Sequence, residues 1–322
     1  MADRDLSCVE LYFPKSRFRS WDHFISEAPE YSIGVEVVDA PPGIQQRRVH
    51  FDHHAGVFRE ATMSAAMQAY LAVRQGKLMR RWLAHRPRVP VYVWNADQDV
   101  CLTVFILEHH ELLERAEGVP QLRWIVQYNN KIDVCGGLYP VSLDELVKNH
   151  FTWVFEPYRQ QRMYGKTAGD AGLVKKTILD VCDRLEALIH GDAGIAPITV
   201  RPEVLYRSER GFVIVDEKGD PACRLVLASE GYINLISLIA TRPNGRYTYS
   251  LIRGTPFDDG AFEIGKLLEA FQAAEDQPTA AIWGGSNLAA GSDSELGSSL
   301  HWKQLRDIAE RVIGENEVVL RR

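Results

Sequence analysis

The chain lacks several features that mark whole classes of protein. Its five cysteines lie far apart and form no CxxC pair, which argues against a zinc ribbon or a disulfide framework. No apolar run reaches membrane-spanning length, and the opening MADRDLSCVELYF has no apolar core of a secretory signal. We therefore expect a cytoplasmic protein with reduced cysteines and no membrane partner.

Positive charge is also scarce. The 37 Lys and Arg residues are outnumbered by 43 Asp and Glu residues, which gives a formal net charge of -6 at pH 7. General affinity for long polyanions depends on many Lys and Arg contacts with phosphate, so long duplex nucleic acid is not an expected partner. A small or short anionic substrate, held by a few local cations, remains compatible with this charge.

The chain is long enough for two domains. Its 322 residues are 46% hydrophobic and 25% charged, which is typical of a globular protein, and we find no internal repeat. The stretch HGDAGIAPITVRP, residues 190–202, gathers Gly, Pro and small residues where the pattern changes. We therefore predict a first domain over residues 1–194 and a second, smaller domain over residues 195–322.

Short apolar runs alternate with helical patterns in the first domain. This order predicts an α/β fold with a largely parallel sheet flanked by helices. Helices are predicted from about residue 60 to 84 and from the fourth strand to about residue 116, and an apolar stripe over 174–188 predicts another helix. The predicted strands are CVELYF, IGVEVVDA, RRVHFDHH, VPVYVWNADQD and LRWIVQYNNKID.

The second domain begins again with strands. The runs GFVIVDEKG, CRLVLA, YINLISLIA and RYTYSLIRG are read as strands, and a helix follows with Ile264, Leu267, Leu268 and Phe271 on one face. A short strand, AAIWGG, then leads into SNLAAGS. These elements predict a smaller α/β unit.

Acidic and imidazole side chains follow each of the later predicted strands of the first domain. Because the carboxyl ends of parallel strands meet at one sheet edge, where ligands of open α/β folds bind, we expect these side chains to lie close together. Unpaired Asp is almost never fully buried, so a cation is expected among them. The candidate metal ligands are Asp39, Asp52, His53, His54, Asn95, Asp97, Asp99 and Asp133.

Two divalent metal ions would neutralise such a group of carboxylates. The mixture of carboxylate and imidazole favours manganese, iron or zinc over calcium. Two metal ions about 3.5–4 Å apart can activate water and clamp a phosphate group. The chemistry implied is hydrolysis of a phosphoester or a phosphoanhydride.

Each element also has an ordinary structural interpretation. Asp39 alone could begin the turn at APPG, and Asp97 with Asp99 could cap the helix that follows them. The metal site is excluded only if all of these structural interpretations are correct together. A second doublet, His109-His110, lies in a predicted helix beside acidic residues, and we interpret it as a solvated face rather than a ligand site.

These residues resemble the DHH phosphoesterase superfamily, which includes single-strand exonucleases, oligoribonucleases, cyclic-dinucleotide phosphodiesterases, exopolyphosphatases and family II pyrophosphatases. Residues 52–54 match the motif that names the family, and NADQD, residues 95–99, resembles its first motif, His-x-Asp-x-Asp. Asp39 and Asp133 resemble its two remaining acids. The resemblance covers most of the chain and implies a DHH-like catalytic domain with two divalent ions, manganese first, with magnesium, iron or zinc as alternatives. It makes Asp39, His53, His54 and Asp99 the catalytic residues.

The second domain resembles the DHH-associated domain. In that family a Gly-rich loop and an upstream Arg hold the phosphate or terminal nucleotide of the substrate. A physical reason supports this independently, because Gly lets backbone amides approach an anion and Arg offers a bidentate fork. The substrate-binding candidates are Arg253, Gly284, Gly285, Ser286, Asn287, Ala289, Ala290 and Gly291.

The chain departs from the family pattern in three ways. The strands of Asp39 and of residues 52–54 precede the strand of residues 95–99, an order that resembles a circular permutation. Asn95 stands where the family has a His, and it binds transition metals less strongly than imidazole. Ser286-Asn287 replaces a frequent Gly-His, which removes a contact to the substrate.

The resemblance implies a phosphohydrolase that cleaves a phosphodiester or phosphomonoester of a small nucleotide or short oligonucleotide by a two-metal mechanism. Two alternatives stay open. One is a nucleotide-binding regulatory protein with impaired catalysis, motivated by Asn95, Asn287 and the altered order. The other is an inorganic pyrophosphatase or an exopolyphosphatase-like hydrolase. A homodimer is also compatible with the sequence.

Overall fold

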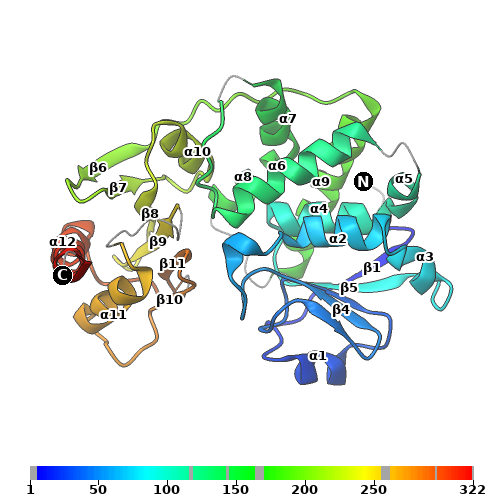
Figure 1. The fold of residues 1–322 in the computed structure, drawn as a ribbon, viewed down its shortest axis with the longest axis horizontal. Helices are drawn as coiled ribbons and strands as arrows, with labels where there is room; N and C mark the ends of the chain where they lie inside the picture. The colour runs from blue at the N-terminus through cyan, green and yellow to red at the C-terminus, as the bar shows by residue number, and fades with distance from the viewer. Residues whose placement is uncertain are drawn as a thin grey trace. The chain divides into compact units, whose positions relative to one another are not determined.

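The computed structural model of the chain describes residues 6–115, 119–142, 145–163, 170–254, 262–293 and 296–320. The chain divides into two compact units, each an α/β unit (Figure 1). The first comprises Met1–Val134 and Asp144–Pro197, and the second comprises Cys135–Leu143 and Ile198–Arg322. The boundary predicted after residue 194 lies close to the change of unit at Pro197, but no sequence pattern indicates that residues 135–143 join the second unit.

The first unit contains a sheet of five strands in the order β1-β5-β2-β4-β3. Neighbours among β1, β5, β2 and β4 pair in parallel, and β3 pairs antiparallel with β4. Every residue of β2, β4 and β5 is buried, as expected of parallel strands covered on both faces. The strands are β1 (Val9–Tyr12), β2 (Ile33–Val35), β3 (Gly43–Gln45), β4 (Arg48–Phe51) and β5 (Val89–Val93).

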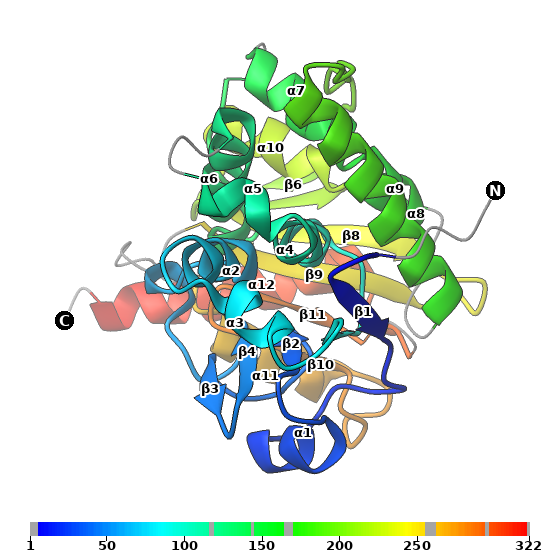
Figure 2. The same ribbon diagram turned by 90° about the vertical axis from the view of Figure 1, so that its right-hand side faces the viewer.

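Helices cover this sheet, with α2 and α4 on one side and α1 on the other in both views (Figures 1 and 2). The α4 helix is central, since each of its residues from Asp99 to Leu107 is buried. The apolar stripe predicted over 174–188 is confirmed, because it is buried on α9. The helices are α1 (Trp21–Glu27), α2 (Ala65–Arg74), α3 (Leu78–Leu83), α4 (Gln98–Glu108), α5 (His110–Glu114), α6 (Pro120–Val134), α7 (Leu146–Val154), α8 (Glu156–Met163) and α9 (Ala171–His190), with a short 3-10 helix at Arg59–Ala61.

Two predicted strands are wrong. LRWIVQYNNKID lies within α6, where the buried residues Leu122, Ile125, Val126, Asn129 and Ile132 recur at helical spacing. CRLVLA lies within α10 (Ala222–Ser229), where nearly the whole apolar run is buried. Short apolar runs of this kind fit a buried strand and a buried helix equally well.

The interpretation of His109-His110 as a solvated face is also wrong. One helix, α4, ends and the next, α5, begins at this doublet. His110 is buried, and its Nδ1 lies 3.2 Å from Glu114 Oε1. His109 Nε2 lies 3.3 Å from Glu186 Oε1. Both imidazoles therefore make contacts within the fold of the first unit.

The second unit contains a sheet of six strands in the order β10-β11-β9-β8-β7-β6. Only the β7 and β8 pair is parallel among these described strands, so the sheet is mixed. Its core includes Phe212, Ile236, Tyr249, Leu267 and Phe271. The strands are β6 (Glu203–Arg207), β7 (Val213–Asp216), β8 (Asn234–Thr241), β9 (Tyr247–Arg253), β10 (Trp283–Gly285) and β11 (Ala289–Ser292), and α11 (Ile264–Ala274) and α12 (Trp302–Leu320) join α10.

Specific contacts explain why the segment after α6 belongs to the second unit. Leu138 is buried against Val213 and Leu235, and the Nη1 of Arg224 donates to the main-chain oxygen of Gly136 at 3.2 Å. Gly136 and its neighbour Gly137 have φ values of 61° and 88°, which glycine adopts without strain. In the described part of the chain, we find no helix with both the length and the apolar character required to cross a membrane.

Candidate metal centre

Three neighbouring parallel strands of the first unit end at the same edge of the sheet, and ionisable residues follow each of them. Glu36 follows β2, Asp52, His53 and His54 follow β4, and residues 95–99 follow β5. This is the edge at which ligands of open parallel sheets bind. A further acid, Asp133, comes from the end of α6 rather than from a strand.

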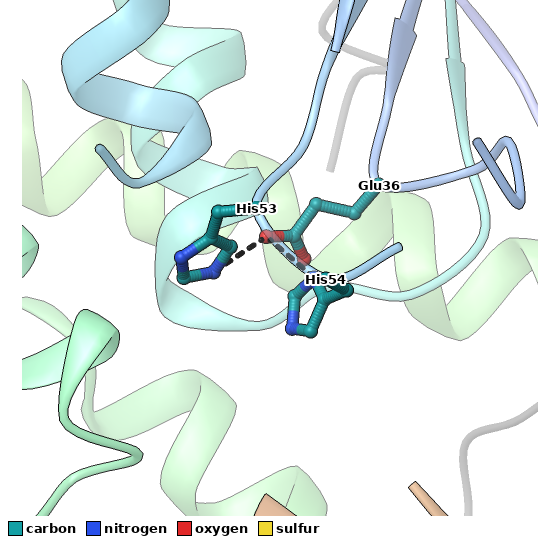
Figure 3. A group of neighbouring side chains, drawn as sticks. All are labelled: Glu36, His53 and His54. Carbon is teal, nitrogen blue, oxygen red and sulfur yellow. Dashed lines mark ion pairs between the residues drawn. The ribbon is translucent and has the colours of Figure 1, made fainter. Parts of the chain in front are cut away.

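Four side chains from these elements form a compact group. One potential ligand atom from each of Glu36, His53, Asp99 and Asp133 lies within 4.8 Å of the others. The Nε2 of His53 is 3.5 Å from Glu36 Oε1 and 3.0 Å from Asp133 Oδ2. His54 forms a second group with Glu36 and His53, its Nδ1 lying 3.7 Å from Glu36 Oε1 (Figure 3). We call the set of these five residues the acid and histidine cluster.

Polar atoms in this cluster are buried without hydrogen bonds from the described residues. They include Glu36 Oε1, His53 Nε2 and Asp133 Oδ2, of which the last two face each other as an ion pair at 3.0 Å. Buried polar groups almost always have partners, so each exception calls for an explanation. A divalent cation fits, because it would accept these carboxylate oxygens and the imidazole nitrogen as ligands.

The electrostatics of the cluster also favour a cation. Burial, followed by the charges of Asp97 and Asp99, raises the pKa of Glu36 well above its usual 4.5. Burial and the charge of Asp133 likewise raise the pKa of Asp99 well above 3.8. Without a cation, these carboxylates are held together at a cost in free energy that protons relieve. A bound divalent ion would relieve it without protonation.

Two other carboxyl groups behave in the opposite way. Burial opposes the ionisation of Asp133, but attraction to His53 outweighs it and holds the pKa of Asp133 well below 3.8. Burial is likewise outweighed at Asp52, where the hydrogen bond and charge of His54 lower the pKa. These two groups remain ionised at neutral pH and supply the permanent negative charge of the site.

Glu36 is a residue that the sequence-based prediction missed, and it replaces Asp39 in the cluster. The predicted strand IGVEVVDA ends in Asp39, whereas β2 ends at Val35. Asp39 is exposed, its N–H donates to Phe18 O at 2.7 Å, and it belongs to neither candidate metal-binding group. The expectation that Asp39 lies among the ligands is therefore corrected. The signal for Glu36 was a single acid inside the apolar run IGVEVV.

The backbone at Glu36 is unusual. Its φ is 50°, in the left-handed region that residues with a Cβ adopt only at some cost. Its N–H donates to Phe51 O at 2.9 Å, so the residue stays attached to the end of β4 as β2 ends. Such strain is found at functional sites when the position of the side chain matters.

Asp52 positions the two histidines instead of joining the candidate metal groups. Its Oδ1 accepts the backbone N–H groups of His53 at 2.7 Å and His54 at 2.9 Å. The same oxygen lies 2.8 Å from the Nδ1 of His54, which fixes the orientation of that ring. Within the described ranges, Asp52 Oδ2 has no hydrogen-bond partner, and it lies 3.6 Å from both Arg17 Nη2 and His50 Nε2.

The motif at residues 95–99 divides into two parts. Asp97 caps α4, since its Oδ1 accepts the N–H of Val100 at 2.9 Å, and its Oδ2 accepts Asn95 Nδ2 at 2.9 Å. The capping interpretation therefore holds for Asp97, although its charge still reaches Glu36. Asn95 is exposed and lies outside both candidate metal groups.

Asp99 is buried in the cluster and connects three helices. At the start of α2, the N–H of Ala65 donates to Asp99 Oδ2 at 2.5 Å and the N–H of Ala66 to Oδ1 at 3.1 Å. Asn129 of α6 donates its Nδ2 to Asp99 Oδ1 at 2.7 Å. The positive end of α2 and this amide hold the carboxylate in place. Asn129 is a second residue that the sequence did not reveal.

Arg59 is a third residue that the sequence did not reveal. It is buried, and its Nη2 donates to the main-chain oxygen of Asp133 at 3.0 Å and lies 3.4 Å from Asp133 Oδ1. Arg59 thus fixes the end of α6 beside the cluster. No local pattern pointed to it, because its partner is 74 positions away in the chain.

In the second unit, the structure brings the predicted Gly-rich loop and Arg253 together. Arg253 ends β9, and its N–H donates to Leu288 O in the turn between β10 and β11. Ser286 Oγ accepts the N–H groups of Leu288 and Ala289, so these amides are already used within the turn.

The glycines of this loop differ in what they do. A Cβ at Gly285, whose φ is 138°, would lie 2.4 Å from Ala290 Cα, and a Cβ at Gly291 would lie 2.4 Å from Tyr249 O. Both are therefore required by the close packing of the hairpin. Gly284 faces open space and Asn287 is exposed, while Ala289 and Ala290 are half-buried strand residues.

Comparisons of the chain with models of protein families, with curated proteins and with solved structures give no match in any of the three.

Proposed function

We propose that the chain is a divalent-metal-dependent phosphohydrolase acting on a phosphodiester or phosphomonoester of a small nucleotide or short oligonucleotide. The observation that carries the proposal is the acid and histidine cluster at the carboxyl end of the parallel sheet, with buried ligand atoms that lack hydrogen bonds from the described residues. The resemblance of residues 52–54 and 95–99 to the DHH phosphoesterases supplies the class of reaction. On this proposal the first unit corresponds to the DHH-like domain and the second to the DHH-associated domain.

Glu36, His53, Asp99 and Asp133 are the residues that would hold a metal ion, and the resemblance adds a second ion. Manganese is the first candidate because oxygen and imidazole donors are mixed, with magnesium, iron or zinc as alternatives. A divalent ion in such a site polarises a phosphate and lowers the pKa of bound water to about 7. The buried carboxylates would give such an ion a fixed set of oxygen donors.

The remaining residues would orient the metal ligands or bind the substrate. Asp52 fixes the ring of His54, whose side chain is 36% exposed and can face a substrate. Arg59 and Asn129 hold Asp133 and Asp99 in position. In the second unit, Arg253 and the loop at 284–291 would bind the phosphate or base of the substrate, as in the family that the loop resembles.

A second candidate function is a nucleotide-binding regulatory protein with impaired catalysis. The observation that favours it is Asn95, whose side chain donates to Asp97 and lies outside both candidate metal groups. The weaker metal binding expected of Asn relative to His would reduce turnover. This candidate predicts nucleotide binding without product release.

The test is an activity assay on the full chain, stripped with EDTA and then supplied with manganese. We expect turnover of bis-p-nitrophenyl phosphate or a dinucleotide that depends on the metal and disappears in Glu36→Gln. Glu230→Gln, which changes an exposed acid in the second unit, is the matched control. Absence of turnover together with nucleotide binding would select the regulatory function, and rapid hydrolysis of pyrophosphate alone would select a pyrophosphatase.

A further inference from the structure

Arg17 is a guanidinium group beside the candidate metal centre that makes no hydrogen bond with the described residues. It lies between β1 and α1, and its side chain is 34% exposed. Its Nε and Nη2 atoms are nevertheless buried and have no hydrogen-bond partner. Its ion pair is with Asp52, and the distance of 3.6 Å from Nη2 to Oδ2 is too long for a hydrogen bond.

The contrast with Arg59 shows what is unusual about Arg17. Arg59 is buried and has a defined task, because its Nη2 donates to Asp133 O at 3.0 Å. Arg17, by contrast, donates no hydrogen bond to a main-chain oxygen or a carboxylate among the described residues, although two of its nitrogens are buried. Leaving charged donors buried and unpaired costs free energy, so a ligand that accepts from them is the simplest explanation.

The chemistry of the neighbourhood indicates which ligand. The negative charge that Asp52 and Asp133 give the site would repel an anionic substrate, so a cation that is not already used by the fold is needed beside the metal site. Arg stays charged at any working pH, and its planar fork matches two oxygens of a phosphate group. We propose that Arg17 binds the non-bridging oxygens of the substrate phosphoryl group. This inference rests on the proposed function and adds a specificity residue to the same site.

The test measures binding and catalysis separately in the full chain loaded with manganese. Equilibrium dialysis with radiolabelled inorganic phosphate gives the affinity, and hydrolysis of bis-p-nitrophenyl phosphate gives KM and kcat. Arg17→Gln should weaken phosphate binding by about tenfold and raise KM by a similar factor, because a charge-assisted bidentate contact is lost. Arg17→Lys should show a smaller loss, since it keeps the charge beside Asp52 but lacks the fork.

Arg19→Gln is the matched control, because Arg19 is an exposed arginine on the same segment. Thermal denaturation of each variant reports whether the fold is intact. The proposal is overturned if Arg17→Gln binds phosphate and substrate as Arg19→Gln does, even if its melting temperature falls, since Arg17 would then only neutralise Asp52. It is also overturned if the wild-type chain binds no phosphate.

The two proposals can fail separately. If the wild-type chain hydrolyses nothing, the proposed function fails, but the dialysis experiment still decides the role of Arg17. Phosphate binding that is lost in Arg17→Gln and kept in Arg19→Gln then supports an anion site without catalysis. If hydrolysis is normal and unaffected by Arg17→Gln, the function stands and the role of Arg17 is wrong.

Discussion

Glu36 in the first unit and Glu275 in the second are both buried glutamates, at 7% and 5% exposure, yet their surroundings differ completely. Glu275 Oε1 accepts from Trp283 Nε1 at 2.7 Å and Ser298 Oγ at 2.5 Å. Its Oε2 accepts the N–H and Oγ of Ser299 at 2.9 and 2.7 Å. Glu275 is therefore a structural acid, because both of its carboxylate oxygens accept hydrogen bonds from neighbouring residues.

Glu36 accepts no hydrogen bond from the described residues, and its Oε1 is buried beside the imidazoles of His53 and His54. The difference shows that burial alone does not distinguish a structural carboxylate from a candidate metal ligand. A better criterion is whether hydrogen-bond donors surround both oxygens of the carboxylate. A buried carboxylate that lacks such donors can still bind a cation.

The largest effect is expected on activity and metal binding. Glu36→Gln should reduce the metal-dependent rate by more than about 100-fold, since even outer partners of metal ligands contribute 10–100-fold. Asp39→Asn should leave the rate nearly unchanged, because Asp39 is exposed and outside the cluster. Steady-state kinetics with manganese checks both. The opposite pattern would restore the assignment made from the sequence.

The same pair of glutamates should respond oppositely in stability. Glu275→Gln should destabilise the second unit by about 3 kcal/mol, because it disturbs buried charge-assisted hydrogen bonds. Glu36→Gln should stabilise the metal-free protein by about 1 kcal/mol, since it removes one of several crowded carboxylates. Urea unfolding in EDTA measures both values. Equal destabilisation by the two changes would mean that Glu36 is as structural as Glu275.

The pH dependence of the metal-free protein should reflect the cluster. The pKa values of Glu36 and Asp99 are raised by folding, so the stability they contribute is present below their usual values of 4.5 and 3.8 and is lost as pH rises through the folded pKa values. The lowered pKa values of Asp52 and Asp133 have the opposite effect only below about pH 4. Stability in EDTA should therefore fall as pH rises above about 5.

Manganese should remove most of this pH slope, because a bound cation replaces the protons. Melting temperatures recorded across the range with EDTA and with manganese test this effect. A slope that is the same in both conditions would show that no cation enters the cluster.

The smallest effect is expected at Asn129, which holds Asp99 by a hydrogen bond of 2.7 Å. Asn129→Leu should lower stability by about 1 kcal/mol and weaken metal affinity by about tenfold, as is typical when a supporting partner is lost. Titration with manganese followed by melting temperature measures both. Unchanged metal affinity would mean that the start of α2 alone positions Asp99.

Features encoded by neighbouring residues could be predicted from the sequence. The buried strands β4 and β5 and the apolar stripe of α9 follow from local patterns, and so does the motif at residues 52–54. Glu36 escaped prediction because the end of β2 is set by pairing with two other strands and not by a visible break in the apolar run. Arg59 and Asn129 escaped because their partners lie 74 and 30 positions away.

The left-handed backbone at Glu36 has a consequence for how this site could change. At a φ of 50°, glycine is the residue that the fold would accept most easily, and glycine has no carboxylate. Stability therefore favours glycine at position 36, whereas binding of a cation would favour glutamate. Selection for heat resistance alone would be expected to replace Glu36 with glycine. Selection for turnover would be expected to retain the glutamate and its strained backbone.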